Sequence, residues 1–178
     1  MKDIDGIGNA WETLKPHWVG IQEHFDRRNA YFLDLILSDR ESLSMVLKSH
    51  LVIEVFLNEF LKNLYGFSKF EDLRLSFSQK AQMIPPNGMP ASWLRPGILQ
   101  LNRVRNKFGH TAGYKLDRYD ITAIFEVLAV ARQGVQFADP ADAIEAFAAV
   151  ACAFLDVPPE EHREIFAEAF SQIRTYEE

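Results

Sequence analysis

Cysteine is nearly absent from this chain, since Cys152 is the only one among 178 residues. A single cysteine excludes an internal disulfide framework, which is the usual support of small secreted domains. Its place in the apolar run FAAVACAFLDV indicates a small core residue rather than a nucleophile. We therefore expect a protein of a reducing compartment, with a cytoplasmic location.

Long apolar runs are also lacking. The longest, AIEAFAAVACAFLDV, contains Glu145 and is shorter than the roughly 18 residues that a membrane span requires. The opening residues MKDIDGIGNAWETL have no apolar segment of the kind that a signal peptide needs. These absences predict a soluble protein that has no membrane as a partner.

Motifs for metals and nucleotides are missing as well. The chain contains no H-E-x-x-H or C-x-x-C pair and no glycine-rich phosphate loop, so we expect neither a metal nor a cofactor. His17 and His24 are seven residues apart and share a helix face only if Pro16 and Gly20 leave the helix intact. Pro16 predicts a boundary or a kink at that point.

Strand signals are weak, because no alternating β-branched runs are joined by Asn-Gly or Asp-Gly turns. Helix signals dominate, and the fold class that they predict is all-α, an antiparallel helical bundle. We expect one helical domain over residues 1–178, with an additional acidic C-terminal helical hairpin at about 139–178. The clearest segments with apolar residues at three- and four-residue spacing are 9–37, 39–66, 92–110, 118–134 and 139–157.

Local signals predict where these helices begin and end. Ser38 or Asp39 is expected to cap the long helix that follows it, and Gly66 is expected to end that helix. Gly109 predicts the end of a later helix in the same way. Asp139, with a proline directly after it, predicts the start of another.

Charge is unevenly distributed around a net value of −6. Residues 1–118 contain 16 basic and 13 acidic side chains, whereas residues 119–178 contain 3 and 12. Within residues 95–118, six Lys or Arg side chains accompany only one acid, Asp117. Net acidity argues against a general nucleic-acid binder, while the local excess forms either solvated helix faces or a surface for an anion such as RNA.

This cationic stretch contains the sequence RNKFGH at residues 105–110. Arg105 and His110 are separated by about 140° on a straight helix, so we expect the helix to loosen at Gly109 and His110 to fold back. A histidine that titrates near neutral pH can take the proton of a ribose 2′-hydroxyl. Arg105 can bind the phosphate as charge builds, and Asn106 can bind a phosphate oxygen or orient the imidazole. The set predicts metal-independent cleavage of RNA.

In its context, LNRVRNKFGHTAGY resembles the signature of the HEPN superfamily, a group of all-α domains with an R-x4–6-H motif. A long apolar helix with an internal acid, Glu54, and then a loop precede the motif here, which is similar to the order of elements in that family. The likeness covers about residues 30–133, which would form a HEPN-like core. It implies a toxin-like or transcription-regulator-like member in which Arg105, Asn106 and His110 are catalytic.

The resemblance also implies a metal-independent endoribonuclease that works as a homodimer, with the motifs of two protomers facing each other. RNA would be the substrate, and we expect Arg103 and Lys107 to contact it. A toxin or defence effector of this kind would have an antitoxin or a regulatory protein as partner. Toxin members often have a tyrosine two residues after the motif histidine, where this chain has Ala112.

Two alternatives remain open from the sequence. Many domains of this kind are interaction or regulatory modules without cleavage activity, in which Arg105 and His110 would stabilise a helix end, since cations are favourable there. His50 and Glu54, four residues apart in the long helix, either support the site or form a polar pair that is bonded within the bundle.

Overall fold

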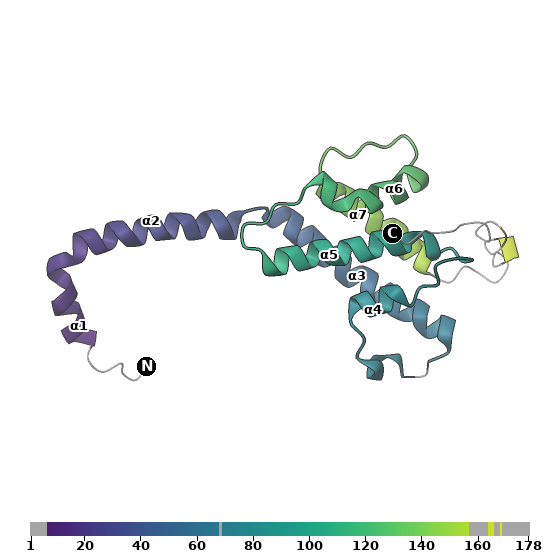
Figure 1. The fold of residues 1–178 in the computed structure, drawn as a ribbon, viewed down its shortest axis with the longest axis horizontal. Helices are drawn as coiled ribbons and strands as arrows, with labels where there is room; N and C mark the ends of the chain where they lie inside the picture. The colour runs from purple at the N-terminus through teal and green to yellow at the C-terminus, as the bar shows by residue number, and fades with distance from the viewer. Residues whose placement is uncertain (1–6, 68, 157–163, 166–167, 169–178) are drawn as a thin grey trace. The chain divides into compact units, whose positions relative to one another are not determined.

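The computed structural model describes residues 7–67, 69–156, 164, 165 and 168. These residues form α-helices and short 3₁₀ turns without a β-strand, which confirms the all-α prediction for this part of the chain (Figure 1). They divide into two compact units, Met1–Ser38 and Asp39–Glu178. None of the described helices is both long enough and apolar enough to cross a membrane.

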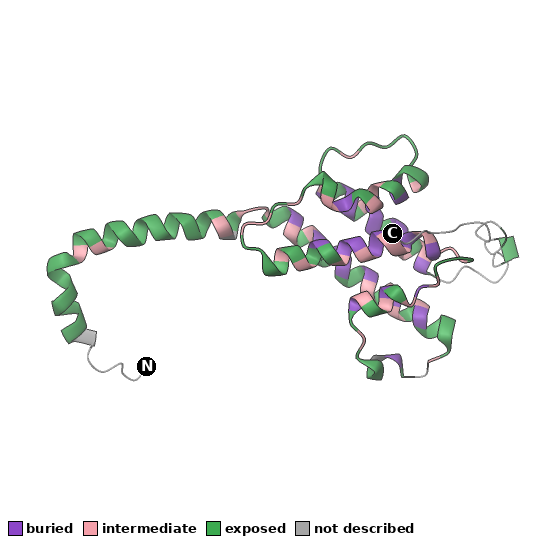
Figure 2. Ribbon diagram, viewed as in Figure 1, coloured by how far each residue is buried: buried purple, intermediate pink, exposed green. Residues whose placement is uncertain are grey.

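The first unit consists of α1 (Ile7–Leu14), a 3₁₀ turn (Lys15–His17) and α2 (Trp18–Leu37). Pro16 lies inside the 3₁₀ turn, where its fixed φ and missing N–H interrupt the α-helix, as the sequence predicts. None of the side chains described in this unit is buried (Figure 2). The unit therefore has helices but no closed core of its own.

The second unit is built around α3 (Arg40–Tyr65), which packs most extensively against α7 and also contacts α5 and α4. α5 in turn contacts α4 and α6, and α6 contacts α7 (Figure 1). The bounds of these four helices are α4 Phe77–Gln82, α5 Arg95–His110, α6 Thr122–Ala131 and α7 Pro140–Leu155.

The core of the second unit is formed by apolar side chains that recur every three or four residues, so that each helix buries one face. The largest side chains with no solvent exposure are Phe147, Ile53, Leu57, Leu61, Ile84, Leu94, Ile98, Leu101, Ile121, Ile124, Ile144 and Leu155. These residues come from α3, α5, α6 and α7 and from the turns between them, which makes this a single shared core.

α7 contributes to this core directly, because Phe147 in its middle is fully buried. Its start agrees with the prediction: Asp139 accepts a hydrogen bond from the N–H of Ala141 at 2.8 Å, and Pro140 occupies the first turn. The second half of the hairpin predicted for residues 139–178 lies largely outside the described residues.

α5 and α7 approach each other closely at Gly97. A Cβ placed on this glycine would lie 2.6 Å and 2.7 Å from two ring carbons of Phe147. Carbon atoms in contact normally stay about 3.5–4.0 Å apart, so the packing of α5 on α7 requires a residue without a side chain here.

The start of α3 differs from the prediction. Asp39 occupies the cap position, but its φ is 49° and its side chain does not cap the helix. Its carboxylate instead accepts a hydrogen bond from the N–H of Leu116 at 2.6 Å, and the hydroxyl of Ser38 donates to the carbonyl of Leu35. Neither residue caps α3, because both side chains bond elsewhere. Gly66 ends the helix with a φ of 68°, as predicted.

Candidate functional site

The candidate site lies at the C-terminal end of α5, where RNKFGH forms the last turns of the helix. The helix continues through Gly109 to His110, and the N–H of Thr111 still bonds to the carbonyl of Lys107 at 2.9 Å. The prediction that the helix loosens at Gly109 was therefore wrong, because this glycine is held within the regular helical ladder. The backbone becomes extended only at Thr111.

Arg105 and His110 thus leave a regular helix about 140° apart and about 7.5 Å apart along the axis. The Arg105 side chain reduces this separation by running toward the C-terminal end of α5. Its Nη1 lies 3.9 Å from the position of a Cβ on Gly109, the residue directly before His110. The Arg105 and His110 side chains are both exposed, so an anion in solvent can reach them.

Asn106 holds the guanidinium in this position, because its Oδ1 accepts a hydrogen bond from Arg105 Nη1 at 3.3 Å. Asn102, Asn106 and His110 follow one another at four-residue intervals and form one ridge on α5. An amide whose oxygen is occupied in this way presents its N–H donors to other acceptors. The end of α5 is therefore rich in hydrogen-bond donors.

A buried histidine lies beneath the first residue of this ridge. The Nε2 of His50, on α3, is 3.3 Å from Asn102 Oδ1, and its ring stacks on Phe77 with centroids 3.8 Å apart. Burial lowers the pKa of His50, and the positive charge of Arg105 is among the groups that lower it further. The contact with Asn102 connects His50 to the ridge that ends in His110, and the lowered pKa favours its neutral form near pH 7.

Glu54 lies one turn after His50 on α3 but bonds to a different helix. Its Oε1 accepts a hydrogen bond from Lys80 Nζ at 2.6 Å, with side chains only 28% and 13% exposed, respectively. His50 and Glu54 are therefore not bonded to each other, and each one links α3 to a neighbouring helix.

His50 and Glu54 have polar partners, Asn102 and Lys80, that were not identified from the sequence. Asn102 could have been found, because it precedes Asn106 by four residues on the same helix face. Lys80 gave no signal, since it lies in a different helix from its partner and 26 residues away.

Lys107 points into a second polar cluster. Its Nζ pairs with Asp120, which also accepts a hydrogen bond from the hydroxyl of Tyr114. Burial raises the pKa of Asp120, but the hydrogen bonds from Lys107 and Tyr114 outweigh this and hold its pKa below the ordinary value. Lys107 would have to leave this carboxylate to contact a phosphate, whereas Arg103 is exposed on α5.

Metal chemistry has no visible support in the described residues, where no group of three or more His, Cys, Asp or Glu side chains could hold an ion. Cys152 is partly buried, and burial raises the pKa of its thiol, which fits a packing role. The groups gathered at the end of α5 are a guanidinium, an amide and an imidazole, and these suit a bound anion.

Comparison with known proteins adds nothing to these residues. No protein-family model, curated protein or solved structure matches the chain.

Proposed function

We propose that this protein is a metal-independent endoribonuclease of the HEPN type, with Arg105, Asn106 and His110 as its catalytic set. One observation supports this most directly. The Arg105 guanidinium, held by Asn106, runs along α5 to Gly109, toward the helix end that carries the exposed His110. Guanidinium and imidazole groups are the donors that a phosphodiester requires when no metal is present.

The proposed reaction is an attack of the ribose 2′-oxygen on the adjacent phosphorus. Neutral His110 takes the 2′-hydroxyl proton while the new 2′-O–P bond forms and the P–O5′ bond breaks. Arg105 neutralises the negative charge that grows on the phosphate oxygens. The leaving 5′-oxygen receives a proton from an imidazolium, so the products are a 2′,3′-cyclic phosphate and a 5′-hydroxyl.

A second protomer would supply that imidazolium. One His110 cannot be both the base and the acid of the same step, and a regular α5 keeps it about 140° from Arg105. A homodimer that brings two α5 ends together solves both problems. The HEPN-like core at residues 30–133 and an antitoxin or regulatory partner belong to the same proposal.

The test is cleavage of a mixed single-stranded RNA pool in EDTA by the natural protein and by Arg105→Ala and His110→Ala. We expect 2′,3′-cyclic phosphate ends, with the rate reduced at least about 100-fold in each variant. Arg27→Ala and His24→Ala are matched controls, since they remove the same exposed side-chain types from α2 and should leave the rate unchanged.

Two outcomes would count against this function. The first is an absence of cleavage by a correctly folded protein. The second is cleavage that survives in both Arg105→Ala and His110→Ala, which would place the activity elsewhere. As a separate measure of binding, Arg103→Ala should weaken RNA affinity and lower the slope of its salt dependence by about 1.

A non-catalytic interaction or regulatory module is the second candidate. It is favoured by the continuous helix at Gly109, which keeps His110 and Arg105 on different sides of α5. In that case the two residues act only as cations at a helix C-terminus. Their removal would then cost about 0.3–1 kcal/mol of stability and change no RNA chemistry.

A further inference from the structure

The first unit has an uncovered apolar seam. Along α1 and α2, large apolar residues alternate at spacings of three and four, which is a period of 3.5 residues. Only Arg28 interrupts the pattern. The members of this seam are Trp11, Leu14, Trp18, Ile21, Phe25, Phe32 and Leu35.

The exposure of the seam is unusual for such large side chains. Trp11, Phe25 and Phe32 are 44%, 56% and 53% exposed, and Figure 2 shows no buried residue along α1 and α2. A contiguous apolar surface of this kind marks an interaction site.

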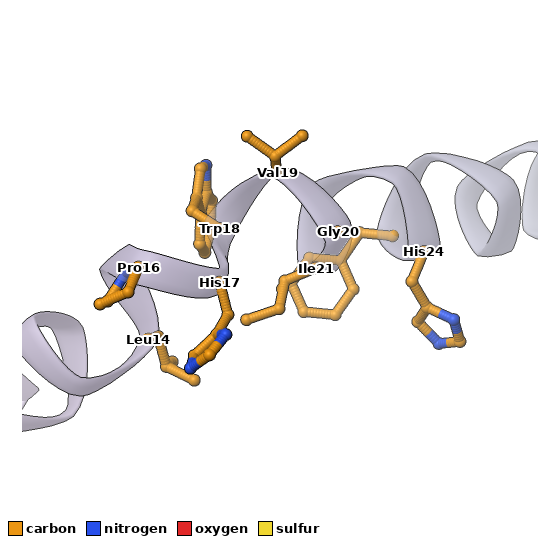
Figure 3. Close-up of a pocket in the computed structure, with 9 residues that line it drawn as sticks. Leu14, Pro16, His17, Trp18, Val19, Gly20, Ile21 and His24 are labelled. Carbon is orange, nitrogen blue, oxygen red and sulfur yellow. The ribbon is translucent and has the colours of Figure 1, made fainter.

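We call α1, the 3₁₀ turn and α2 together the arm. The seam stays on one side of this arm across the 3₁₀ turn. The rings of Trp11 and Trp18 meet edge to face at 5.0 Å, and those of Trp18 and Phe25 at 6.4 Å. Figure 3 shows Leu14 and Ile21 pointing to the same side. Leu14, Trp18, Ile21 and Phe25 are among the residues that line a concavity of about 790 Å³ at this bend. The surface is therefore shaped to receive side chains.

We infer that the seam is filled by the same seam of a second copy of this chain, in the antiparallel orientation. Within α2, which is an unbroken helix, Trp18, Ile21, Phe25, Phe32 and Leu35 keep the 3.5-residue period, which is the pattern of helices that pair along one line. Residues 7–38 contain three Lys or Arg and four Asp or Glu side chains, so two arms do not repel each other. A two-fold interface also requires that the surface be complementary to itself.

The antiparallel orientation provides this complementarity. When Trp18 faces Leu35 of the second copy, Ile21 faces Phe32 and Phe25 faces Arg28, so each pair along α2 joins a large ring to a different side chain. Arg28 then lies over a phenyl ring, which is a favourable cation–π arrangement. In the parallel orientation, two Arg28 side chains would meet inside an apolar seam and repel each other.

A membrane surface fits the arm less well. Helices that lie on membranes have a polar face rich in Lys and Arg. Here the remaining positions include the acidic residues Glu12, Glu23, Asp26 and Asp34. The pairing goes beyond the proposed function, because it uses the arm and none of the residues of α5.

The test is the mass in solution of the full-length protein, measured by light scattering and by sedimentation against the 20.4 kDa of one chain. Ile21→Glu places a charge in the seam, and Ala30→Glu places the same charge on the opposite side of α2, because nine residues turn a helix by about 180°. We expect Ile21→Glu to raise the dissociation constant of the arm-mediated assembly at least about 100-fold, and Ala30→Glu to leave it unchanged. Equal masses for the natural protein and Ile21→Glu would overturn the inference.

The orientation has its own test in a Cys152→Ala background. Mixed Trp18→Cys and Leu35→Cys chains should form a disulfide between unlike chains, while Leu35→Cys alone should not cross-link. Cross-linking of Leu35→Cys with itself would overturn the antiparallel arrangement. Binding of the natural protein to anionic vesicles that is lost in Ile21→Glu, without self-association, would assign the seam to a membrane instead. RNA cleavage by the Ile21→Glu variant is scored separately, so this inference and the proposed function fail independently.

Discussion

Replacing Gly97 with alanine perturbs the closest contact between α5 and α7. The added Cβ would lie 2.6 Å from a ring carbon of Phe147, about 1 Å inside the normal contact distance. Phe147 is fully buried, so its ring cannot move into solvent to relieve the overlap. The helices must separate, or the ring must leave its preferred rotamer.

The size of the effect follows from two opposing contributions. Overpacking of a filled core costs about 1–3 kcal/mol, while alanine is intrinsically better than glycine in a helix by about 1 kcal/mol. Because the overlap is with a fully buried ring, we take the upper part of the overpacking range, about 2–3 kcal/mol, so Gly97→Ala should lose about 1–2 kcal/mol net and lower the melting temperature by about 2–8 °C. Thermal unfolding followed by circular dichroism measures this shift.

Gly109→Ala is the matched control, because it makes the same substitution in the same helix. The nearest atom to its Cβ is Arg105 Nη1 at 3.9 Å, an ordinary contact, so only the helix preference remains. This variant should gain about 0.5–1 kcal/mol. In a Phe147→Leu background, Gly97→Ala should cost less stability than it does in the natural protein, since the two positions are in contact. A Gly97→Ala protein as stable as the natural one would refute the reasoning.

Three further predictions concern the polar clusters. His50→Gln should flatten the pH dependence of stability: the folded-state pKa of His50 lies below the unfolded value, so stability is complete above about pH 7 and decreases as the pH falls toward the folded pKa. Thermal unfolding across that range checks this, and an unchanged slope would contradict it. Glu54→Gln should lose about 1–2 kcal/mol in urea denaturation, because Lys80 keeps its charge in a partly buried position without its anion. Asp120→Asn should lower the pKa of Tyr114, which burial and then this carboxylate raise, as ultraviolet absorbance titration would show.

Features that depend on neighbouring residues were predictable from the sequence. Apolar spacing predicted α3, α5 and α7, and the interruption at Pro16 and the end at Gly66 followed from backbone chemistry. Asp39 and Gly109 gave wrong predictions, because the outcome at each depends on groups that spacing does not reveal. The Asp39 carboxylate bonds to a backbone N–H that is 77 positions away.

The candidate site follows the same division. Residue types and spacing located Arg105, Asn106 and His110 at the end of one helix. The packing of other helices against α5 decided the rest, including the bond between His50 and Asn102 across 52 positions. No periodic pattern in a single chain encodes such a pair, so its members are found only when the helices are assembled.

The link between Asp39 and Leu116 has a consequence for the order of events during synthesis. α3 can form its own backbone hydrogen bonds as soon as residues 40–65 have left the ribosome. Asp39, the residue directly before this helix, holds a left-handed backbone, which costs an L-residue roughly 1–2 kcal/mol, and its compensating partner is the N–H of Leu116. On a ribosome-bound chain that ends before Leu116, Asp39 should still sample right-handed conformations. The entry to α3 becomes fixed only after the whole of α5 has emerged.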